Sequence, residues 1–549
     1  MPTISPLAPN RPVDVIVEAQ QLYRAEQLSR GLNWERVATQ IEEGFTPLSC
    51  GLSFVHQEPE SDDLLTDLAF TGLAGTIQLL FAATTINGGL QQYCVTTSGL
   101  YIYDEDNDRW DSAGIALNGS TNIKADWAPV PSQGWVVITN GVDTPFRYDG
   151  TNAVTLDSLN TTFTSFTARY VASWQNLLIF LDTTEAGVRR KYRVRRSDVG
   201  NPNEWEEGLA GRTDLLDSPE DIVGSRPLGP YLIVYRQRSL VRGSWGGQTS
   251  ATFDFNTRIQ ADGPLSAHAI TALEDTHFFA GQFGIYMYRG GLEVVQITDK
   301  LARNLFVPSG VLERQESRES VNLIADQVRH SIMLFLYNDG TVLRRCIPSS
   351  PQGTDIYVAY IPRNFSSEIR WGRRELDYTA DVAGTFVPDI GTIQWQDLVG
   401  NWDAQTVPWD TWALNSARYG RPAMCRSDRT IGHWQGVGPG AGYWLYHTPT
   451  VRSIHKSLGI DGFYLEYVCR PSNAGVNVRL ELDGGNDPAK VIEITANGSD
   501  SEEPSLLLHR EQLSGKQARL VISGESYVRL IEYGYLFSEL VRADSTGGT

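Results

Sequence analysis

The sequence has few cysteines, no long apolar run and none of the short motifs that mark common catalytic sites. Its five cysteines, among 549 residues, lie far apart and form no CxxC pair. This spacing indicates free thiols in a reduced compartment rather than a disulfide framework. No run of about 18 apolar residues occurs, and the N-terminus shows no basic segment followed by an apolar stretch. We therefore expect a protein that folds in the cytosol, carries no secretion signal and does not bind a membrane by itself.

Catalytic motifs are also missing. The eight histidines include no HExxH pair, and the chain has no G-x-S-x-G elbow, no Walker loop and no G-x-G-x-x-G after a strand. The segment 104–108 places carboxylates at alternate positions as a calcium loop does, but Arg109 and Ile115 stand where that loop needs glycine and glutamate. An acidic hairpin tip is the better interpretation. We expect no enzymatic activity, no cofactor and no metal site.

Basic residues are outnumbered by acidic ones. The chain has 46 Lys and Arg against 65 Asp and Glu, for a formal net charge of −19. Such a charge repels nucleic-acid phosphates and anionic membranes at long range. The composition excludes a general DNA binder, although an acidic surface would suit a wall past which DNA slides without sticking.

A chain of this length exceeds a single core, which stops growing at about 250–300 residues. We expect three regions. Residues 1–60 start with a proline-rich arm and continue with short helices over residues 14–43, interrupted at Gly31-Leu32-Asn33. Residues 61–445 are expected to form a β-propeller-like domain, and residues 446–549 a small β-sandwich whose last residues, 542–549, are disordered.

The propeller prediction rests on a recurring pair of short runs. Apolar runs at 134–138, 176–180, 231–235, 277–280 and 331–335 alternate with runs of glycine or serine, apolar residues and tyrosine, such as 98–103, 145–150 and 283–291. The pair returns roughly every 40–60 residues, near the spacing of propeller blades. A pair of β-sandwiches with a similar supply of strands is the alternative.

The C-terminal region has a different texture. Its strands are expected at 462–468, 476–482, 491–494 and 518–522, where Val and Leu alternate with Asn, Arg and Glu. This alternation indicates one buried face and one wet face, as in a sandwich.

The strongest charge feature is a basic stripe at 189–196. We identify Arg189, Lys191, Arg193 and Arg195 as candidate subunit-interface residues, because alternate residues of a strand share a face and arginine favours multidentate pairs. The competing interpretation is a strand face that pairs with local acids.

Tryptophans and carboxylates support a rival function, carbohydrate binding or cleavage. Tryptophans crowd the middle and late chain, and carboxylate pairs such as Asp214/Asp217 or Glu220/Asp221 could serve a glycosidase, which needs two carboxyls across a sugar. Tryptophans in β proteins also serve as core residues. This alternative predicts a central pocket in which two carboxyls face an aromatic platform.

Three segments carry a resemblance to a known family: 169–178, then 192–198 followed by Asn201-Pro202 and Trp205, and 279–286. They resemble the tail nozzle, or packaged-DNA stabilisation protein, of short-tailed bacteriophages. The resemblance spans roughly residues 90–310, with a looser match from 392 to 412, and rests on patterns of blade construction rather than on catalytic fingerprints.

The resemblance implies a structural virion protein assembled in the host cytoplasm. Its subunits would form a six-fold ring below the head-to-tail connector. Such a ring extends the DNA exit channel, retains packaged DNA that passes without sequence-specific binding, and anchors tail fibre, spike or needle proteins. The family offers no catalytic residues to carry over to this chain.

Overall fold

The structure is a computed structural model of the full chain. It describes the strands at 22–25, 31–32, 45–46, 49–50, 52–53, 60–61 and 65–68, and residues 72–538 except for gaps. The gaps are 85–89, 105–106, 108, 248–252, 299–300, 302–304, 307–319, 328, 341–344, 346–351, 364–368, 387–420, 427, 435–443, 449, 453–457, 471–473, 484, 486, 498–503, 512 and 526.

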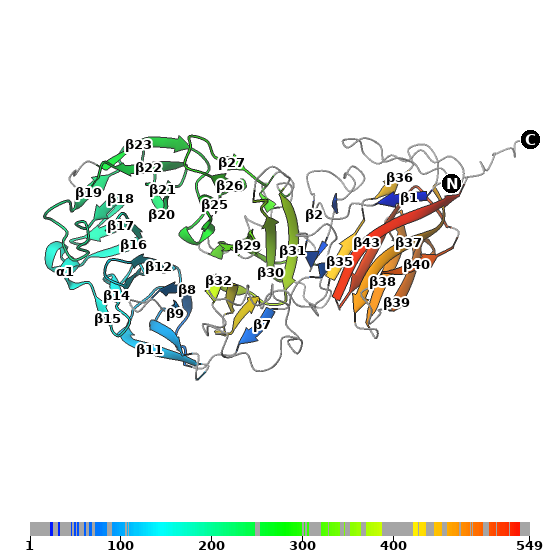
Figure 1. Ribbon diagram of the computed structural model, residues 1–549, viewed down its shortest axis with the longest axis horizontal. Helices are drawn as coiled ribbons and strands as arrows, with labels where there is room; N and C mark the ends of the chain where they lie inside the picture. The colour runs from blue at the N-terminus through cyan, green and yellow to red at the C-terminus, as the bar shows by residue number, and fades with distance from the viewer. Residues whose placement is uncertain are drawn as a thin grey trace, which may run out of the picture.

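Seven antiparallel sheets are arranged radially around one axis in the described part of the chain (Figure 1). Six of them have four strands, and the seventh adds two short N-terminal strands to its four. The expected β-propeller is therefore confirmed, and its blades number seven.

The blades follow the chain in order. Blade 1 contains β8 (Ile77–Thr84), β9 (Leu90–Thr96), β10 (Gly99–Asp104) and β11 (Arg109–Ala116); blade 2 contains β12 (Asp126–Val130), β13 (Trp135–Thr139), β14 (Phe146–Tyr148) and β15 (Ala153–Thr155); blade 3 contains β16 (Thr167–Trp174), β17 (Leu177–Glu185), β18 (Val188–Arg196) and β19 (Gly211–Asp214); blade 4 contains β20 (Ile222–Leu228), β21 (Tyr231–Arg236), β22 (Ser239–Trp245) and β23 (Phe253–Gln260). Blade 5 contains β24 (Ile270–Leu273), β25 (Thr276–Ala280), β26 (Ile285–Tyr288) and β27 (Val295–Gln296); blade 6 contains β28 (Asn322–Asp326), β29 (Ser331–Asn338), β30 (Gly353–Tyr360) and β31 (Arg370–Leu376); blade 7 contains β32 (Ala380–Phe386), β33 (Arg421–Arg426), β34 (Ile431–Trp434) and β7 (Leu65–Leu68).

The apolar runs of the sequence are strands buried on both faces. In β17, Leu177, Ile179 and Leu181 belong to a core shared with blade 4. The alternate residues Leu178 and Phe180 belong to a core shared with blade 2. Because neighbouring strand residues point to opposite faces, a blade between two others needs apolar residues at every position. This requirement explains runs such as 176–180.

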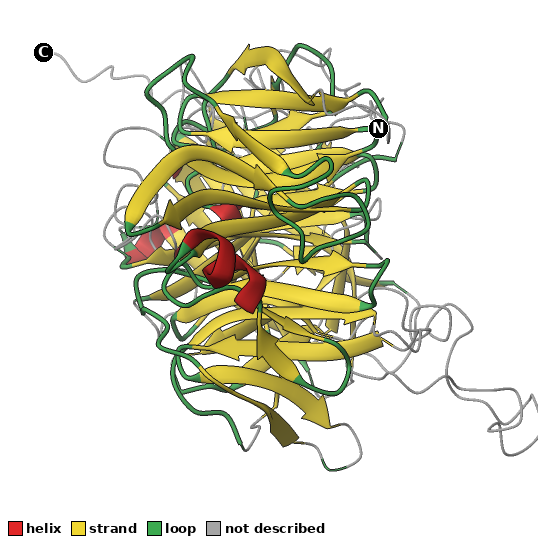
Figure 2. Ribbon diagram, turned by 90° about the vertical axis from the view of Figure 1, so that its left-hand side faces the viewer, coloured by secondary structure: helices red, strands yellow, loops and turns green. Residues whose placement is uncertain are grey.

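An N-terminal strand closes the ring. β7 pairs with β34, so the last blade joins three strands from residues 380–434 to one from residues 65–68. The first strands of the blades lie innermost, and β32 of blade 7 lies beside β8 of blade 1. The short helix α1 (Asp157–Phe163) lies outside the blades (Figure 2).

Two further sheets form the β-sandwich. One contains β37 (Leu458–Arg470), β43 (Tyr527–Ser538), β40 (Ser505–His509) and β41 (Leu513–Gly515); the other contains β38 (Gly475–Leu482), β39 (Val491–Asn497), β42 (Gln517–Gly524), β35 (Trp444–His447) and β36 (Val451–Arg452). Their facing side chains, which include Leu465, Leu480 and Tyr533, form one core. β35 crosses the expected boundary at 445/446 and pairs with β42.

The described residues at 22–25 form a strand, where a short helix was expected, and residues 31–32, where the helical stretch was expected to break, form another. β1 (Leu22–Ala25) extends the sandwich through β43, and β2 (Gly31–Leu32) pairs with β31 of blade 6 and with β3 (Phe45–Thr46). β4 (Ser49–Cys50), β5 (Leu52–Ser53) and β6 (Glu60–Ser61) also join the sandwich sheets. The open edges of long strands offer backbone partners, and this pairing outweighs an irregular helical pattern. The rest of the expected helical stretch lies outside the described residues, as do residues 1–13 and 542–549.

Propeller and sandwich share apolar packing. A single hydrophobic cluster contains Met333, Phe335 and Ile356 of blade 6, Met424 of blade 7, and the sandwich residues that include Leu465. The outer strand β31 also lies against β4 and β5. No helix in the described residues is long and apolar enough to cross a membrane.

Candidate functional site

The basic stripe forms strand β18, the third strand of blade 3. Arg193 donates from Nε and Nη2 to the two carboxylate oxygens of Asp214 at 2.7 and 2.8 Å, and from Nη1 to Glu185 at 2.8 Å. Arg195 donates to the same Glu185 at 3.1 and 2.6 Å and lies over the Phe163 ring, 4.2 Å from its centroid. The side chains of both arginines are only 7% exposed.

The carboxylates of this network are held ionised. Burial opposes the charge on Glu185, but hydrogen bonds and charges from Arg195 and Arg193 outweigh it, and its pKa is lowered. The hydrogen bond from Arg193 is the main cause that lowers the pKa of Asp214. Each charge of the network thus stabilises its neighbours at neutral pH.

The other two interface candidates are more exposed. Arg189 donates to Asp182 at 2.8 and 2.5 Å, with 44% of its side chain exposed. The Nζ atom of Lys191 lies 2.8 Å from a carboxylate oxygen of Asp221, the residue that precedes blade 4 in the sequence. The Lys191 side chain is 48% exposed. The geometry therefore favours local pairing for Arg193 and Arg195, while an interface role for Arg189 and Lys191 stays a prediction.

A second buried charge network lies in blade 6 and was not predicted from the sequence. Arg373 on β31 bridges Asp355 at 2.8 Å and Glu375 at 2.6 Å, and all three side chains are fully buried. Tyr357 and Asn338 donate hydrogen bonds to Asp355. Burial nevertheless raises the pKa of Asp355. The signal in the sequence was the run of three charged residues, Arg373, Arg374 and Glu375, within a strand.

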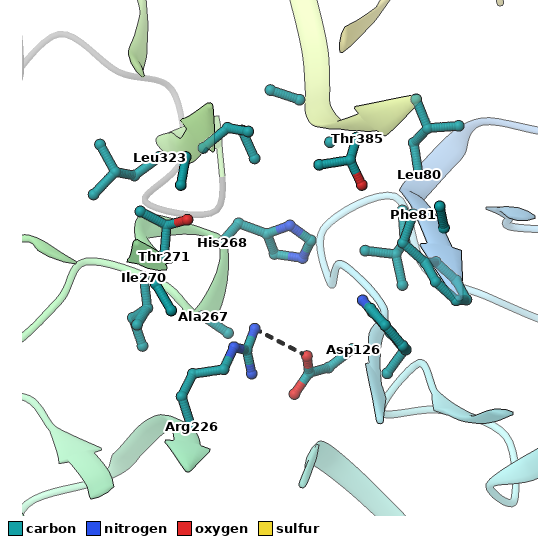
Figure 3. A pocket seen from close by; sticks show the side chains of 18 of the residues that line it. Leu80, Phe81, Asp126, Arg226, Ala267, His268, Ile270, Thr271, Leu323 and Thr385 are labelled. Carbon is teal, nitrogen blue, oxygen red and sulfur yellow. Dashed lines mark ion pairs between the residues drawn. The ribbon is translucent and has the colours of Figure 1, made fainter. Parts of the chain in front are cut away.

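A cavity of about 340 Å³ lies where the inner strands of six blades converge. Figure 3 shows its interior, with the His268 ring pointing into it. The lining residues are Leu79, Leu80, Phe81, Ala82, Leu90, Asp126, Trp127, Arg226, Ala267, His268, Ile270, Thr271, Ala272, Leu323, Ile324, Ala325, Gln327, Ala383, Gly384 and Thr385.

Charged and polar groups gather on one side of this cavity. Arg226 of β20 lies 3.3 Å from Asp126 of β12, and Asp126 also accepts a hydrogen bond from the Val171 amide at 3.1 Å. The Nε2 atom of His268 lies 3.0 Å from the carbonyl oxygen of Ala125. Burial, and then the positive charges of Lys124 and Arg226, lower the pKa of His268 to about 3. The ring is therefore neutral, and Nε2 carries the proton because its partner is a carbonyl.

The cavity differs from the pocket that carbohydrate cleavage would need. Among the described lining residues Asp126 is the single carboxylate, and it is paired with Arg226. Trp127 lies at the lining but stacks on Phe81, with 4.2 Å between ring centroids. Trp174, Trp205, Trp371 and Trp444 are buried core residues. The stretch from Trp395 to Trp412 lies outside the described residues.

One absence concerns metal binding and holds for the described part of the chain. It contains no group of three His, Cys, Asp or Glu side chains that could hold a metal ion. At the candidate calcium loop, β10 pairs with β11 in antiparallel fashion, and Asp104 lies opposite Arg109 in the register. The described cysteines Cys94, Cys425 and Cys469 are buried and form no disulfide with one another.

No protein-family model and no curated protein sequence matches this chain. Among solved structures, it is similar to a catalytically inactive virginiamycin B lyase from Staphylococcus aureus with quinupristin. The identity is 12% and the TM-score 0.37, over 68% of this chain and 99% of the lyase. It is also similar to the extracellular domain of a B. thetaiotaomicron protein described as a one-component system, at 11% identity and a TM-score of 0.31, over 50% of this chain and 39% of that one. Similarity at this level says nothing about the function of this chain.

Proposed function

We propose that this chain is a structural subunit of a phage tail nozzle, which works by shape and assembly. Copies of it would form a ring, six-fold by the family resemblance, below the head-to-tail connector in the virion. The ring would extend the DNA exit channel and anchor fibre, spike or needle proteins. Residues 90–310, which carry the resemblance, include β9 to β27, that is blade 1 without its first strand and blades 2 to 5.

The observation that carries the proposal is the apolar cluster shared by the propeller and the sandwich. Residues of blades 6 and 7 and of both sandwich sheets belong to it. β2 and β4 lie beside β31, so N-terminal strands reinforce the same junction. Domains joined by a large apolar interface do not move freely relative to each other. A rigid two-domain body of this kind suits a load-bearing ring subunit.

The proposal requires that DNA passes between subunits and not along the axis of a propeller. The cavity of about 340 Å³ has the size of a small-molecule site, and the ion pair of Asp126 and Arg226 forms part of its lining. The channel wall would therefore be built from the outer surfaces of several copies. A net charge of −19 adds no attraction for the phosphates of the moving DNA.

Sedimentation of the purified chain, alone and with the connector protein of its own particle, tests the proposal. We expect an assembly of several copies whose formation the connector promotes. Lys191→Glu would weaken it if this exposed residue lies at the interface, whereas Arg109→Glu, an exposed cation on the outer strand β11, serves as the matched control. A chain that stays monomeric at high concentration with and without the connector would contradict the proposal.

The carbohydrate alternative remains a separate prediction. The cavity lining supplies one carboxylate instead of two, so the geometry favours it less than the assembly role.

A further inference from the structure

One buried arginine of blade 3 has no carboxylate partner. Arg196 is the last residue of β18 and is only 9% exposed. Its Nε atom donates to the carbonyl oxygen of Leu209 at 3.1 Å, and Nη1 donates to Oγ1 of Thr213 at 3.3 Å. Both acceptors are neutral. In the described part of the chain no ion pair joins Arg196 to a carboxylate, in contrast to Arg193 and Arg195 on the same strand.

The charge of this arginine is not compensated within the chain. Burial, and then the positive charge of Arg195, lower the pKa of Arg196 to about 10, so the guanidinium is still protonated at pH 7. The carboxylates that neutralise Arg193 and Arg195 lie on the other face of β18, because neighbouring residues of a strand point to opposite faces. A buried charge is unfavourable unless an opposite charge pairs with it. Arg196 therefore favours an anion from outside the chain.

The guanidinium is fixed between blades 3 and 4, with one edge open. Its Cζ atom lies 4.0 Å from the centroid of the Phe253 ring on β23, and Phe253 in turn stacks on Trp245 with 5.5 Å between ring centroids. Gly211 of β19 lies beside it, since a Cβ atom there would be 3.0 Å from Nη2. Nη2 itself donates no hydrogen bond to a described residue. The missing side chain at Gly211 thus leaves room for an acceptor at Nη2.

The free donors have the geometry that an oxyanion needs. A guanidinium carries five N–H donors in a planar fork, which binds carboxylate and phosphate oxygens through charge-assisted hydrogen bonds. We infer that Arg196 anchors an oxyanion site at the junction of blades 3 and 4, which takes a carboxylate or phosphate group from outside the chain. A free anion or an acidic side chain of another copy supplies this group. The inference does not rest on the proposed assembly role, because a free anion would bind to a single chain.

Thermal unfolding of the full chain at pH 7, in sodium phosphate and in sodium chloride of equal ionic strength, tests the site. Phosphate also stabilises proteins in general, because it is excluded from their surfaces, so the difference between the two salts is compared among variants. With a Kd of about 5 mM, phosphate at about 50 mM should raise the Tm of the wild type by roughly 2–3 °C beyond this general effect. Arg196→Gln should lose that additional rise.

Arg212→Gln is the matched control. Arg212 is exposed and lies opposite Arg195 in the register, so its side chain is on the other face of the sheet, and the variant should keep the full response to phosphate. Should Arg196→Gln fail to fold, Gly211→Ala would place a Cβ atom 3.0 Å from Nη2 and should abolish the response while the charge is kept. A response that survives in Arg196→Gln or Gly211→Ala, or that Arg212→Gln removes to the same extent, would overturn the inference.

Sedimentation of the same variants distinguishes the two sources of the oxyanion. If another copy supplies a carboxylate, Arg196→Gln should weaken self-association at least tenfold, phosphate should compete with it, and Arg212→Gln should have no effect. If the anion is free, self-association is the same in all variants and only the thermal response differs. Either result supports the site, whereas a wild type without the additional phosphate response, together with unchanged self-association in Arg196→Gln, would overturn it. A chain that does not self-associate but keeps the phosphate response contradicts the assembly role alone.

Discussion

Replacing Arg193 by alanine is predicted to destabilise blade 3 far more than the same replacement of Lys191, although both cations lie on β18. Arg193 is 7% exposed and makes three charged hydrogen bonds, to Asp214 and Glu185. Lys191 is 48% exposed and has one contact, to Asp221. Comparing the two variants separates the effect of burial from the effect of charge, because both residues lie on the same strand and carry the same charge.

The expected magnitude follows from what each change leaves behind. Breaking a buried ion pair costs about 3–5 kcal/mol. We expect the lower end, about 3 kcal/mol, because Glu185 keeps Arg195 and Asp214 is 24% exposed to water. With a melting-temperature change of about 2 °C per kcal/mol, the lower end for larger domains, Arg193→Ala should melt roughly 6 °C below the wild type. An exposed pair contributes about 0–1 kcal/mol, so Lys191→Ala should shift the melting temperature by under about 2 °C.

Differential scanning calorimetry at pH 7 and at pH 3 measures both effects. The pKa of Asp214 is lowered in the folded state, so its contribution is present above its unfolded pKa of about 3.9 and is lost as pH falls through the folded value. The gap between wild type and Arg193→Ala should therefore narrow at pH 3. Equal shifts for the two variants at pH 7, or a gap that widens in acid, would show that the buried ion pairs of Arg193 do not stabilise blade 3 more than the exposed pair of Lys191.

Two other replacements test the cores. Gly524→Ala would place a Cβ atom 2.6 Å from Cζ2 of Trp444. Measured by chemical denaturation, this overpacking should destabilise the sandwich by about 1–3 kcal/mol. Gly291→Ala is the control, because a Cβ atom there meets nothing within 4 Å and should change stability little. Phe335→Ala removes a ring that is 2% exposed from the apolar cluster shared by propeller and sandwich, and should lower the free energy of unfolding by about 3–5 kcal/mol. Phe283, which is 58% exposed, is the control, and its replacement by alanine should change the free energy of unfolding very little. Equal losses of stability in the two variants would contradict the assignment of Phe335 to the core.

The blades were predictable because their signal is local. Each apolar run, such as 176–180, is bounded by turn residues, and the turn at Gln175 and Asn176 has positive φ at both positions, as a two-residue hairpin requires. The closing strand β7 was not predictable, since it pairs with β34 more than 350 residues away in sequence. Pairing between distant segments leaves no mark in local periodicity.

The partners of the basic stripe were equally hidden. Strand alternation placed Arg193 and Arg195 on one face, and both do bind Glu185. Lys191 binds Asp221 instead. The pairing of β17 with β18 is irregular between Leu181 and Thr183, where Asp182 has a φ of 52°. This irregularity separates Lys191 from Arg193. The cavity was missed for a related reason. Its lining comes from six blades, and neither His268 nor Arg226 belongs to a sequence motif.

Electron microscopy of the purified chain mixed with the connector of its particle would show whether copies of this chain assemble into a ring. We expect closed rings, six-fold by resemblance, with a central hole between the copies that is wide enough for DNA. The axis of each seven-bladed propeller is expected to be too narrow for DNA. Isolated monomers, or a ring whose DNA passes through the propeller axes, would contradict this expectation.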